Sequence, residues 1–230
     1  MSKVKLLARQ LERRILSGEW VPGDKIPTQV RLMSELGVAR TTLREAISLL
    51  QSRGFIKARH GSGTYIVNLF EQGFLPPINQ LSMHDPKAQL AVLEMRQVLE
   101  GQAAWHACER ASDAELMEID AEYQRMLQRA VDVPLLVRAK ADLTFHMLIA
   151  KASHNLLVAS LSQLLYNKMF NTIFAALSSG MLEQPGSMEA IDQQHARIHF
   201  ALMARDAQEV RREAQEHGRH TAQMLGQQLQ

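Results

Sequence analysis

The chain has 230 residues, of which 46% are apolar and 22% are charged, an ordinary composition with room for two small domains. Its net charge of +2 conceals an uneven distribution. Residues 1–70 carry 12 Lys and Arg against 5 Asp and Glu, whereas residues 71–230 carry 14 against 19. A basic head followed by an acidic body indicates that the head alone has a polyanion as its partner.

Targeting and membrane segments are not indicated. Basic residues interrupt the apolar residues of the N-terminus, which therefore lacks the core of a signal peptide: Lys3, Lys5, Arg9, Arg13 and Arg14. No apolar run approaches the roughly 20 residues of a membrane-spanning helix, so we expect a cytoplasmic protein without membrane contact. The single cysteine, Cys108, excludes an internal disulfide and is expected as a buried small side chain on a helix face.

The first two predicted helices lie within residues 1–37. Apolar residues recur at helical spacing before Gly18 ends the run: Val4, Leu7, Leu11 and Ile15. A turn at residues 21–24 follows, and Thr28 can cap a second, short helix that ends at Gly37. The residues expected to face inward from this second helix are Val30, Met33 and Leu36.

A third helix follows after a tight link, and its two sides differ. The apolar side has the spacing i, i+3, i+4, i+7 and consists of Leu43, Ala46, Ile47 and Leu50. Arg40, Thr41 and Arg44 fall on or near the polar side, at the start of the helix. The second and third helices therefore form a helix-turn-helix, in which the later helix presents its start to the major groove of DNA.

A hairpin completes the head. Gly54 stops the third helix, and strands are expected at residues 55–59 and 64–67. The glycines of the turn His60-Gly61-Ser62-Gly63 permit close approach to a sugar-phosphate backbone, as in a wing. The alternative is a generic three-helix domain with a solvated basic face, which the agreement of helix lengths, turn, wing and charge disfavours.

Roles in DNA recognition can be assigned to individual residues of the third helix. Arg40 and Arg44 suit bidentate contacts to guanine, each worth about 1 to 3 kcal/mol of base discrimination. A phosphate contact without sequence preference is an equal alternative for either arginine. Thr41, Thr42 and the helix N-terminus suit phosphate.

The head resembles the winged helix of GntR-family regulators in the segments PTQVRLMSELGVARTTLREAISLLQSRGFI and HGSGTYI. The resemblance implies that DNA is contacted by Arg40, Thr41, Arg44, His60 and Gly61. Gln29-Val30 stands where the family usually has Glu-Arg, so Arg31 is the residue that can supply the phosphate-binding cation. Ala39 stands where the family favours Ser or Thr, so a helix cap worth about 1 kcal/mol is absent.

Residues 71–84 are predicted to be a linker, because glycine, prolines and asparagine occur there without periodicity. Every strong signal in residues 85–230 is helical, so the fold class is mainly α, a winged helix-turn-helix followed by an all-α antiparallel bundle. The helices of the bundle are expected at residues 85–111, after the capping box Ser112-x-x-Glu115, at residues 134–152, 156–179 and 188–204, and after the cap Asp206-x-x-Glu209. A loop is expected at residues 180–187.

A metal site is one interpretation of the histidines in this body. Asp142 and His146 have i, i+4 spacing and can bind one ion from one helix face, and His195 and His217 lie on the last two helices. On spacing alone the signal is weak, since pairs that include His199 or His220 fit equally well and a lone Asp-x-x-x-His is commonly a surface hydrogen bond.

The body resembles the FCD domain that follows the winged helix in the FadR-like branch of the GntR family. There one aspartate and three histidines hold a divalent metal, often zinc, with the separations of 4, 49 and 22 residues that join Asp142, His146, His195 and His217. The resemblance implies that these four residues bind a Zn²⁺ ion and that His199 and His220 do not bind it. His106 and His154 are expected to be structural.

Three imidazoles and one carboxylate leave a coordination position open for an anion. The resemblance assigns Arg96, in LEMRQVLEG, as a second clamp on a carboxylate, the alternative being an i, i+4 ion pair with Glu100. Asn171, in KMFNTIF, can bind a hydroxyl of the effector or serve a structural role. The segments ASHN, MFN and IDQQHARI resemble glycolate-utilisation regulators, and AWHACERAS resembles lactate-utilisation regulators.

The leading hypothesis is therefore a homodimeric transcriptional regulator that binds a palindromic operator and responds to a small carboxylate such as a 2-hydroxy acid. One alternative is a metal sensor in which the ion itself is the signal. Another is a metal-dependent hydrolase, against which stand the lack of HExxH and of a general base near the four ligands in sequence. A nonspecific nucleic-acid-binding protein is the third.

Overall fold

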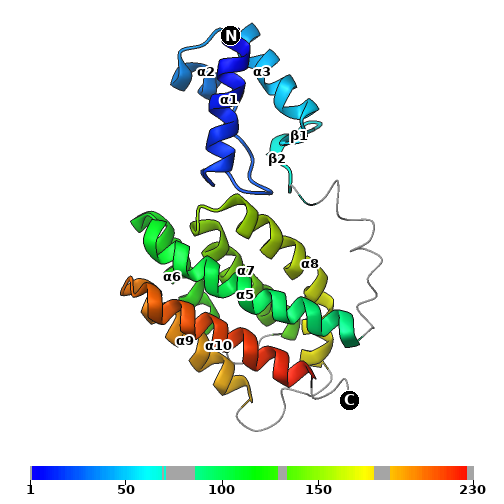
Figure 1. Ribbon diagram of the computed structural model, residues 1–230, viewed down its shortest axis with the longest axis vertical. Coiled ribbons are helices and arrows are strands. Elements are labelled where there is room, and N and C mark those ends of the chain that lie inside the picture. The colour runs from blue at the N-terminus through cyan, green and yellow to red at the C-terminus, as the bar shows by residue number, and fades with distance from the viewer. Residues whose placement is uncertain (1, 69, 71–85, 129–133, 179–186, 227–230) are drawn as a thin grey trace. The chain divides into compact units, whose positions relative to one another are not determined.

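A computed structural model describes residues 2–68, 70, 86–128, 134–178 and 187–226 (Figure 1). The chain divides into two compact units, Met1–Leu75 and Pro76–Gln230. The expected linker, residues 71–84, lies outside the described residues, and its boundaries stay predictions. A helical first unit with one small sheet and a helical second unit confirm the expected fold class.

The first unit consists of three helices and a hairpin. The helices are α1 (Lys3–Leu16), α2 (Gln29–Leu36) and α3 (Arg40–Ser52), and the strands are β1 (Ile56–Arg59) and β2 (Gly63–Ile66). Helix α1 packs mainly on α3, whose predicted apolar stripe is fully buried. The strands pair antiparallel with Ile56 opposite Ile66, and Gly61 has the left-handed φ of 68° that the turn requires.

Three expected helix-end features in the head, at Thr28, Gly37 and Ala39, are confirmed. The Thr28 hydroxyl accepts from the backbone N–H of Arg31 at the start of α2, and Gly37 ends α2 with a φ of 61°. Ala39 occupies the cap position of α3 and makes no side-chain cap, as its methyl group dictates. The start of the recognition helix is therefore held without a cap.

The prediction that Val30 faces inward is wrong. Its side chain is 78% exposed, whereas Leu32, which the pattern did not single out, is fully buried. Helical rotation of about 100° per residue places Leu32, Met33 and Leu36 on one side of α2 and turns Val30 away from it. In a helix of eight residues, three apolar positions fit more than one face.

The described part of the second unit is built from helices. They are α5 (Pro86–Arg110), α6 (Asp113–Gln128), α7 (Leu135–Ala152), α8 (Leu156–Ser178), α9 (Ser187–Met203) and α10 (Ala207–Gly226). The predicted helices agree with these bounds within a few residues, although residues 129–133 and 179–186 lie outside the described part of the chain. The backbone N–H of Glu115 donates to the Ser112 hydroxyl and the backbone N–H of Ser112 to the Glu115 carboxylate, which confirms the capping box.

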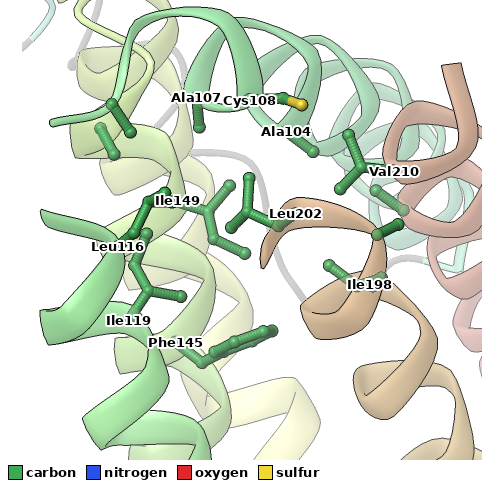
Figure 2. Close-up of a cluster of buried hydrophobic side chains, with 14 of the residues drawn as sticks. Ala104, Ala107, Cys108, Leu116, Ile119, Phe145, Ile149, Ile198, Leu202 and Val210 are labelled. Carbon is green, nitrogen blue, oxygen red and sulfur yellow. The ribbon is translucent and has the colours of Figure 1, made fainter. Parts of the chain in front are cut away.

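One apolar cluster joins five of these helices (Figure 2). Helix α5 contributes Ala104, Ala107 and Cys108, α6 contributes Leu116 and Ile119, α7 contributes Phe145 and Ile149, α9 contributes Ile198 and Leu202, and α10 contributes Val210. Cys108 is 3% exposed, as expected of a buried small side chain, and burial raises the pKa of its thiol. The cluster fixes the spacing of the helices that carry the predicted metal ligands.

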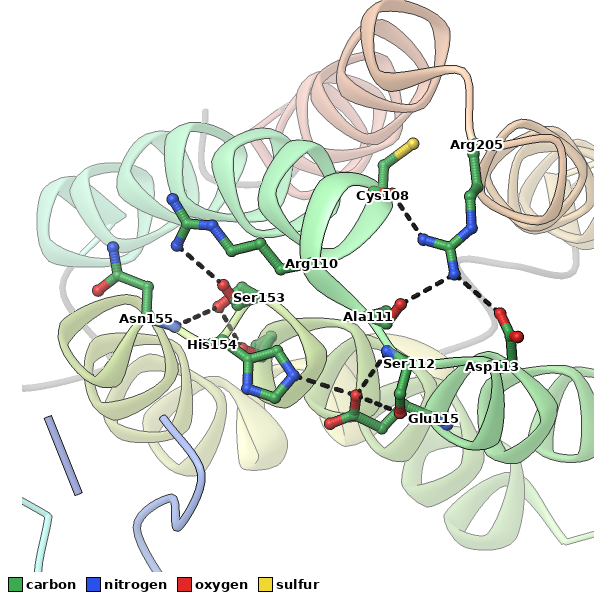
Figure 3. A network of polar contacts seen from close by, with 11 residues as sticks. Cys108, Arg110, Ala111, Ser112, Asp113, Glu115, Ser153, His154, Asn155 and Arg205 are labelled. Atoms are coloured by element: carbon green, nitrogen blue, oxygen red, sulfur yellow. Dashed lines mark hydrogen bonds and ion pairs between the residues drawn. The ribbon is translucent and has the colours of Figure 1, made fainter. Parts of the chain in front are cut away.

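Polar contacts at one end of the bundle hold the helix turns together (Figure 3). Arg205 donates to the carbonyl oxygens of Cys108 and Ala111, which satisfies free acceptors at the end of α5. His154 donates to the Glu115 carboxylate at 3.0 Å and so ties the α7–α8 turn to the start of α6. His154 is therefore a hydrogen-bonded structural residue, as predicted.

Candidate metal centre and nucleic-acid interface

The structure brings Asp142, His146, His195 and His217 together inside the second unit, with one donor atom of each within 4.8 Å of the others. The Nε2 atom of His195 lies 3.0 Å from Oδ1 of Asp142 and 3.3 Å from Nε2 of His146. All three imidazoles are buried, while the side chain of Asp142 keeps 20% of its surface exposed. The cluster thus consists of nitrogen and oxygen donors that are shielded from solvent except at Asp142.

Three helices supply these donors. Helix α7 carries Asp142 and His146 one turn apart, α9 carries His195, and α10 carries His217. Helix α10 can lie close to α5 because Gly218, next to His217, has no side chain where Gln97 of α5 approaches. The three helices therefore converge on one point although the ligands are far apart in sequence.

The unpaired atoms of the cluster fit a cation. The Nε2 atom of His217 is buried and has no hydrogen-bond partner among the described residues, while its Nδ1 donates to Gln194 at 3.0 Å. An unsatisfied buried acceptor is costly unless something binds it. Three imidazoles and one carboxylate are the donor types that zinc prefers in proteins.

The protonation states of the cluster also suit metal binding. Burial raises the pKa of Asp142, but the hydrogen bond with His195 and the surrounding positive charges outweigh it, so the pKa lies well below its ordinary value. Burial lowers the pKa of His146 to about 4 and, together with the neighbouring imidazoles, holds the pKa of His217 well below its ordinary value. An ionised carboxylate therefore faces two neutral imidazoles at neutral pH.

Arg96 lies beside the cluster and is only 2% exposed. Its Nε donates to Glu100 at 2.5 Å, so the predicted alternative of an i, i+4 ion pair is present. Its Nη2 lies 3.9 Å from Oδ2 of Asp142 and has no hydrogen-bond partner within the described ranges. Although burial opposes the charge, Glu100 and Asp142 raise the pKa of Arg96 above its ordinary value. One edge of this permanent cation is held by a hydrogen bond, and the other edge has no hydrogen bond among the described residues.

Glu100 contacts several of the residues around the cluster. Its Oε1 accepts from Arg96 and from the hydroxyl of Tyr166, the latter at 2.8 Å, and lies 3.6 Å from Nδ1 of His146. A cavity of about 10 Å³ borders Glu100, His146 and Tyr166. That volume holds about one water molecule. A ligand larger than water can enter only if side chains or helices move.

The other histidines in the described part of the body lie outside the cluster. His199 Nε2 lies 2.8 Å from Asp120, and its ring stacks on Tyr123 with centroids 4.0 Å apart. The Nε2 of His106 accepts from the amide of Gln102 at 2.9 Å. His220 is half-buried on α10. The side chain of Asn171 lies outside the described residues, so its predicted contact with a ligand stays a prediction.

In the head, the basic residues divide into paired and unpaired groups. Arg14 pairs with Glu19 and Glu35, and Arg53 pairs with Glu12. Arg31, Arg40 and Arg44 are exposed and have no ion pair among the residues that the structure describes. These three cations, all near the start of α2 or α3, are free to meet phosphate or bases.

The remaining predicted DNA contacts follow the same surface. Thr41, His60 and Gly61 are exposed, whereas Thr42 is half-buried behind the start of α3. Arg59 of the wing stacks on Tyr65 with its guanidinium carbon 4.5 Å from the ring centre, and the Tyr65 and Ser62 hydroxyls are 2.6 Å apart. The wing thus presents ordered polar groups at its tip.

Comparison with known proteins assigns the family. The profile of bacterial regulatory proteins of the gntR family matches residues 4–66, and the profile of the FCD domain matches residues 91–220. The chain belongs to the gntR family. GntR regulators bind DNA and small-molecule effectors, so this FCD-containing protein is a transcriptional regulator and not an enzyme, and the hydrolase alternative is excluded.

Two known regulators are similar in sequence to this GntR protein. It is 31% identical over 217 residues to the Glc operon transcriptional activator of Escherichia coli K12, covering 93% of this chain and 85% of the relative. A second protein of that strain, assigned as the L-lactate dehydrogenase operon regulatory protein, is 30% identical over 199 residues, covering 85% of this chain and 75% of the relative. Both matches extend well beyond the winged helix.

Solved structures share the fold. A Streptococcus agalactiae GntR protein superposes with a TM-score of 0.54 and 24% identity, over 96% of this chain and 99% of that one. E. coli McbR/YncC gives a TM-score of 0.54 with 18% identity over the whole of both chains. In the described part of this GntR protein, no helix combines the length and apolar character required to cross a membrane.

Sequence reasoning missed two residues around the cluster of this GntR protein and one contact of a third. Gln194 contacts His217, and Tyr166 donates to Glu100, which was considered only as a partner of Arg96. The separation between Tyr166 and Glu100 is 66 residues, and no local pattern links them. Two signals were available in the sequence. Gln194 directly precedes the predicted ligand His195, and Arg96 and Glu100 form an i, i+4 pair in an apolar helix.

Proposed function

We propose that this GntR protein is a cytoplasmic homodimer whose winged helices bind a palindromic operator and whose FCD domain binds a small carboxylate at a Zn²⁺ ion. Asp142, His146, His195 and His217 would hold the ion. Binding of the acid would shift the protein between arrangements with different affinities for DNA. The convergence of these four donors in a buried site is the observation that carries the proposal.

Zinc would supply a positive charge and an open coordination position for a carboxylate or hydroxyl oxygen. Arg96 supports the same ligand class, because its Nη2 is buried, cationic and without a hydrogen-bond partner in the described part of the chain. Glu100 holds the opposite edge of the guanidinium and so fixes its plane. An acid with two adjacent oxygen groups could contact the ion and Arg96 together.

The size of the site favours a small acid. The cavity beside His146 has a volume of only about 10 Å³, which is room for about one water molecule. A 2-hydroxy acid such as glycolate or lactate requires the smallest displacement among acids that offer a carboxylate and a second oxygen. The likeness to glycolate- and lactate-operon regulators supports the same class. The acid must displace the side chains or helices around the cavity, and this displacement could change how the helices pack.

The surface of the head supports operator binding. Arg31, Arg40 and Arg44 are exposed cations near the starts of α2 and α3, and the wing tip carries His60 and Gly61. Two copies related by a twofold axis would read two half-sites of a palindrome. Because a palindrome needs two copies of the head, homodimerisation is part of the proposal.

The experiment compares His217→Ala with the matched control His220→Ala, three residues away on the same helix. Metal content, thermal shift with glycolate, lactate, pyruvate and citrate, and operator affinity are measured for each, with and without chelator. We expect His217→Ala to lose zinc and the response to acid but to retain DNA binding, while His220→Ala behaves as wild type. Operator release by acid in a metal-free His217→Ala protein would contradict the proposal.

The same measurements separate the metal-sensor alternative. If the ion itself is the signal, operator affinity should follow zinc occupancy when no acid is present. If the acid is the signal, zinc-loaded protein should change its operator affinity only when acid is added. Each outcome is read from the same titration of labelled operator DNA.

A further inference from the structure

We infer that Gln194 is a positioning residue that fixes the tautomer of His217, so that Nδ1 carries the hydrogen and Nε2 is left as the electron-pair donor. The inference deepens the proposed metal site and rests on it for its function. Gln194 contacts one of the four donor residues, His217. Gln194 acts through His217 and is not itself a ligand.

The geometry is specific to this pair. Gln194 precedes His195 on α9, and its Oε1 lies 3.0 Å from Nδ1 of His217 on α10. Gln194 is 7% exposed and His217 is 2% exposed, so water does not compete freely for either group. On the other side of the ring, His217 Nε2 is buried without a partner among the described residues. One ring nitrogen is thus held and the other faces the donor cluster.

The chemistry of the two groups assigns the hydrogen. An amide oxygen can only accept a hydrogen bond, so Nδ1 of His217 must be the donor. A neutral imidazole carries one N–H, and with that hydrogen on Nδ1, the Nε2 lone pair is free. If the amide were reversed, its N–H₂ would donate to Nδ1 and the ring hydrogen would point from Nε2 into the cluster, where it would repel a cation.

The other two histidines have weaker support of this kind. The Nδ1 atom of His146 lies 3.6 Å from Glu100, too far for a hydrogen bond, and the Nδ1 of His195 is buried without a partner within the described residues. His217 is therefore the imidazole whose orientation depends most directly on one neutral side chain. Because Gln194 and His195 are adjacent on α9, a movement of α9 against α10 would alter two ligands together.

The test uses three variants of the full chain. Gln194→Met keeps the length of the side chain but removes the amide oxygen, and Gln194→Glu keeps an acceptor at the same place. Gln193→Met is the matched control, because Gln193 is the exposed neighbour on the same helix. Thermal unfolding of the metal-free proteins checks that each variant is folded.

Two measurements are made. Nitrogen-15 NMR of the metal-free protein reports the tautomer of His217, and competition with a chromophoric chelator reports the affinity for zinc. We expect the Nδ1–H tautomer in the wild type, in Gln193→Met and in Gln194→Glu, and a mixture in Gln194→Met. Loss of such an outer contact weakens metal binding by about 10- to 100-fold, so Gln194→Met should fall in that range while the other variants stay within a few-fold of wild type.

An Nε2–H tautomer in the wild type would overturn the inference, as would wild-type zinc affinity in Gln194→Met. If Gln194→Met does not fold, the wild-type spectrum and the Gln194→Glu variant still decide the question. The tautomer is read without metal, so its outcome is independent of the proposed function. A wild-type protein with the Nδ1–H tautomer that binds no zinc would refute the metal site and leave the positioning contact intact.

Discussion

Gly218 of α10 lies so close to Gln97 of α5 that a Cβ atom on residue 218 would stand 2.8 Å from the Cα atom of Gln97. Backbone, not a flexible side chain, occupies that space. The adjacent residue is His217, and its position relative to α5 therefore depends on the lack of a side chain at position 218. Helix spacing and site assembly are linked at this contact.

Gly218→Ala should separate α5 from α10 and reduce the free energy of unfolding by about 1 to 3 kcal/mol, as overpacking does elsewhere. We also expect weaker zinc binding, because His217 moves with α10. Urea denaturation of the metal-free protein and competition with a chelator measure the two effects.

The matched variant is Gly101→Ala on α5. Its new Cβ would meet Gln215, but the nearest atoms are the far end of that flexible side chain. A gain of about 0.8 to 1.0 kcal/mol from helix propensity opposes the crowding, so the net change should be small. Equal losses in the two variants would show that close backbone approach is not the cause.

Ala39→Ser should stabilise the head. The residue has the extended φ of −69° and ψ of 149° of a cap position but makes no cap hydrogen bond, and a serine there is worth about 1 kcal/mol. Trp20 fluorescence in a Trp105→Phe background measures unfolding of the first unit alone. Thr28→Ala, which removes the existing cap of α2, should shift the transition by a similar amount in the opposite direction.

Val30→Arg should raise operator affinity. Val30 is 78% exposed at the start of α2, and the added cation would meet phosphate if this end of α2 lies on the DNA backbone. The plot of log affinity against log salt should steepen by about 1. Ser34→Arg adds the same charge to the other half of α2, so an equal gain there would reveal only an effect of net charge.

Acid should destabilise the metal-free protein. The pKa of His146 is lowered by burial to about 4 in the folded state, whereas an unfolded histidine titrates near about 6.5. Above about pH 6.5 the residue is neutral in both states and does not change stability with pH. As the pH falls from about 6.5 to about 4, His146 binds a proton in the unfolded state but stays neutral in the folded state, so the free energy of unfolding decreases.

His146→Asn measures this contribution. The variant lacks the titratable ring, so the difference in unfolding free energy between wild type and variant should become less favourable to wild type between about pH 6.5 and about pH 4. Parallel curves over this interval would contradict the assigned burial of a neutral His146. Both proteins are treated with chelator, because bound zinc would hold the ring deprotonated.

Local chemistry in the sequence determined most of the head. Thr28, Gly37 and Gly54 end or begin helices through capping and left-handed backbone, and the stripe of α3 from Leu43 to Leu50 is long enough to define one buried face. Helix α2 is too short for that, since Val30 and Leu32 could each have been the buried residue. Packing against the rest of the unit selected Leu32.

The sequence also determined which donor types the body offers, and family spacing selected Asp142, His146, His195 and His217 from a larger set of histidines. Their convergence, the contact of Gln194 with His217 and the sharing of Glu100 by Arg96 and Tyr166 were decided only by tertiary structure. The reason is physical. Helical periodicity specifies one face of one helix, whereas the distance between faces depends on how closely pairs such as α5 and α10 pack.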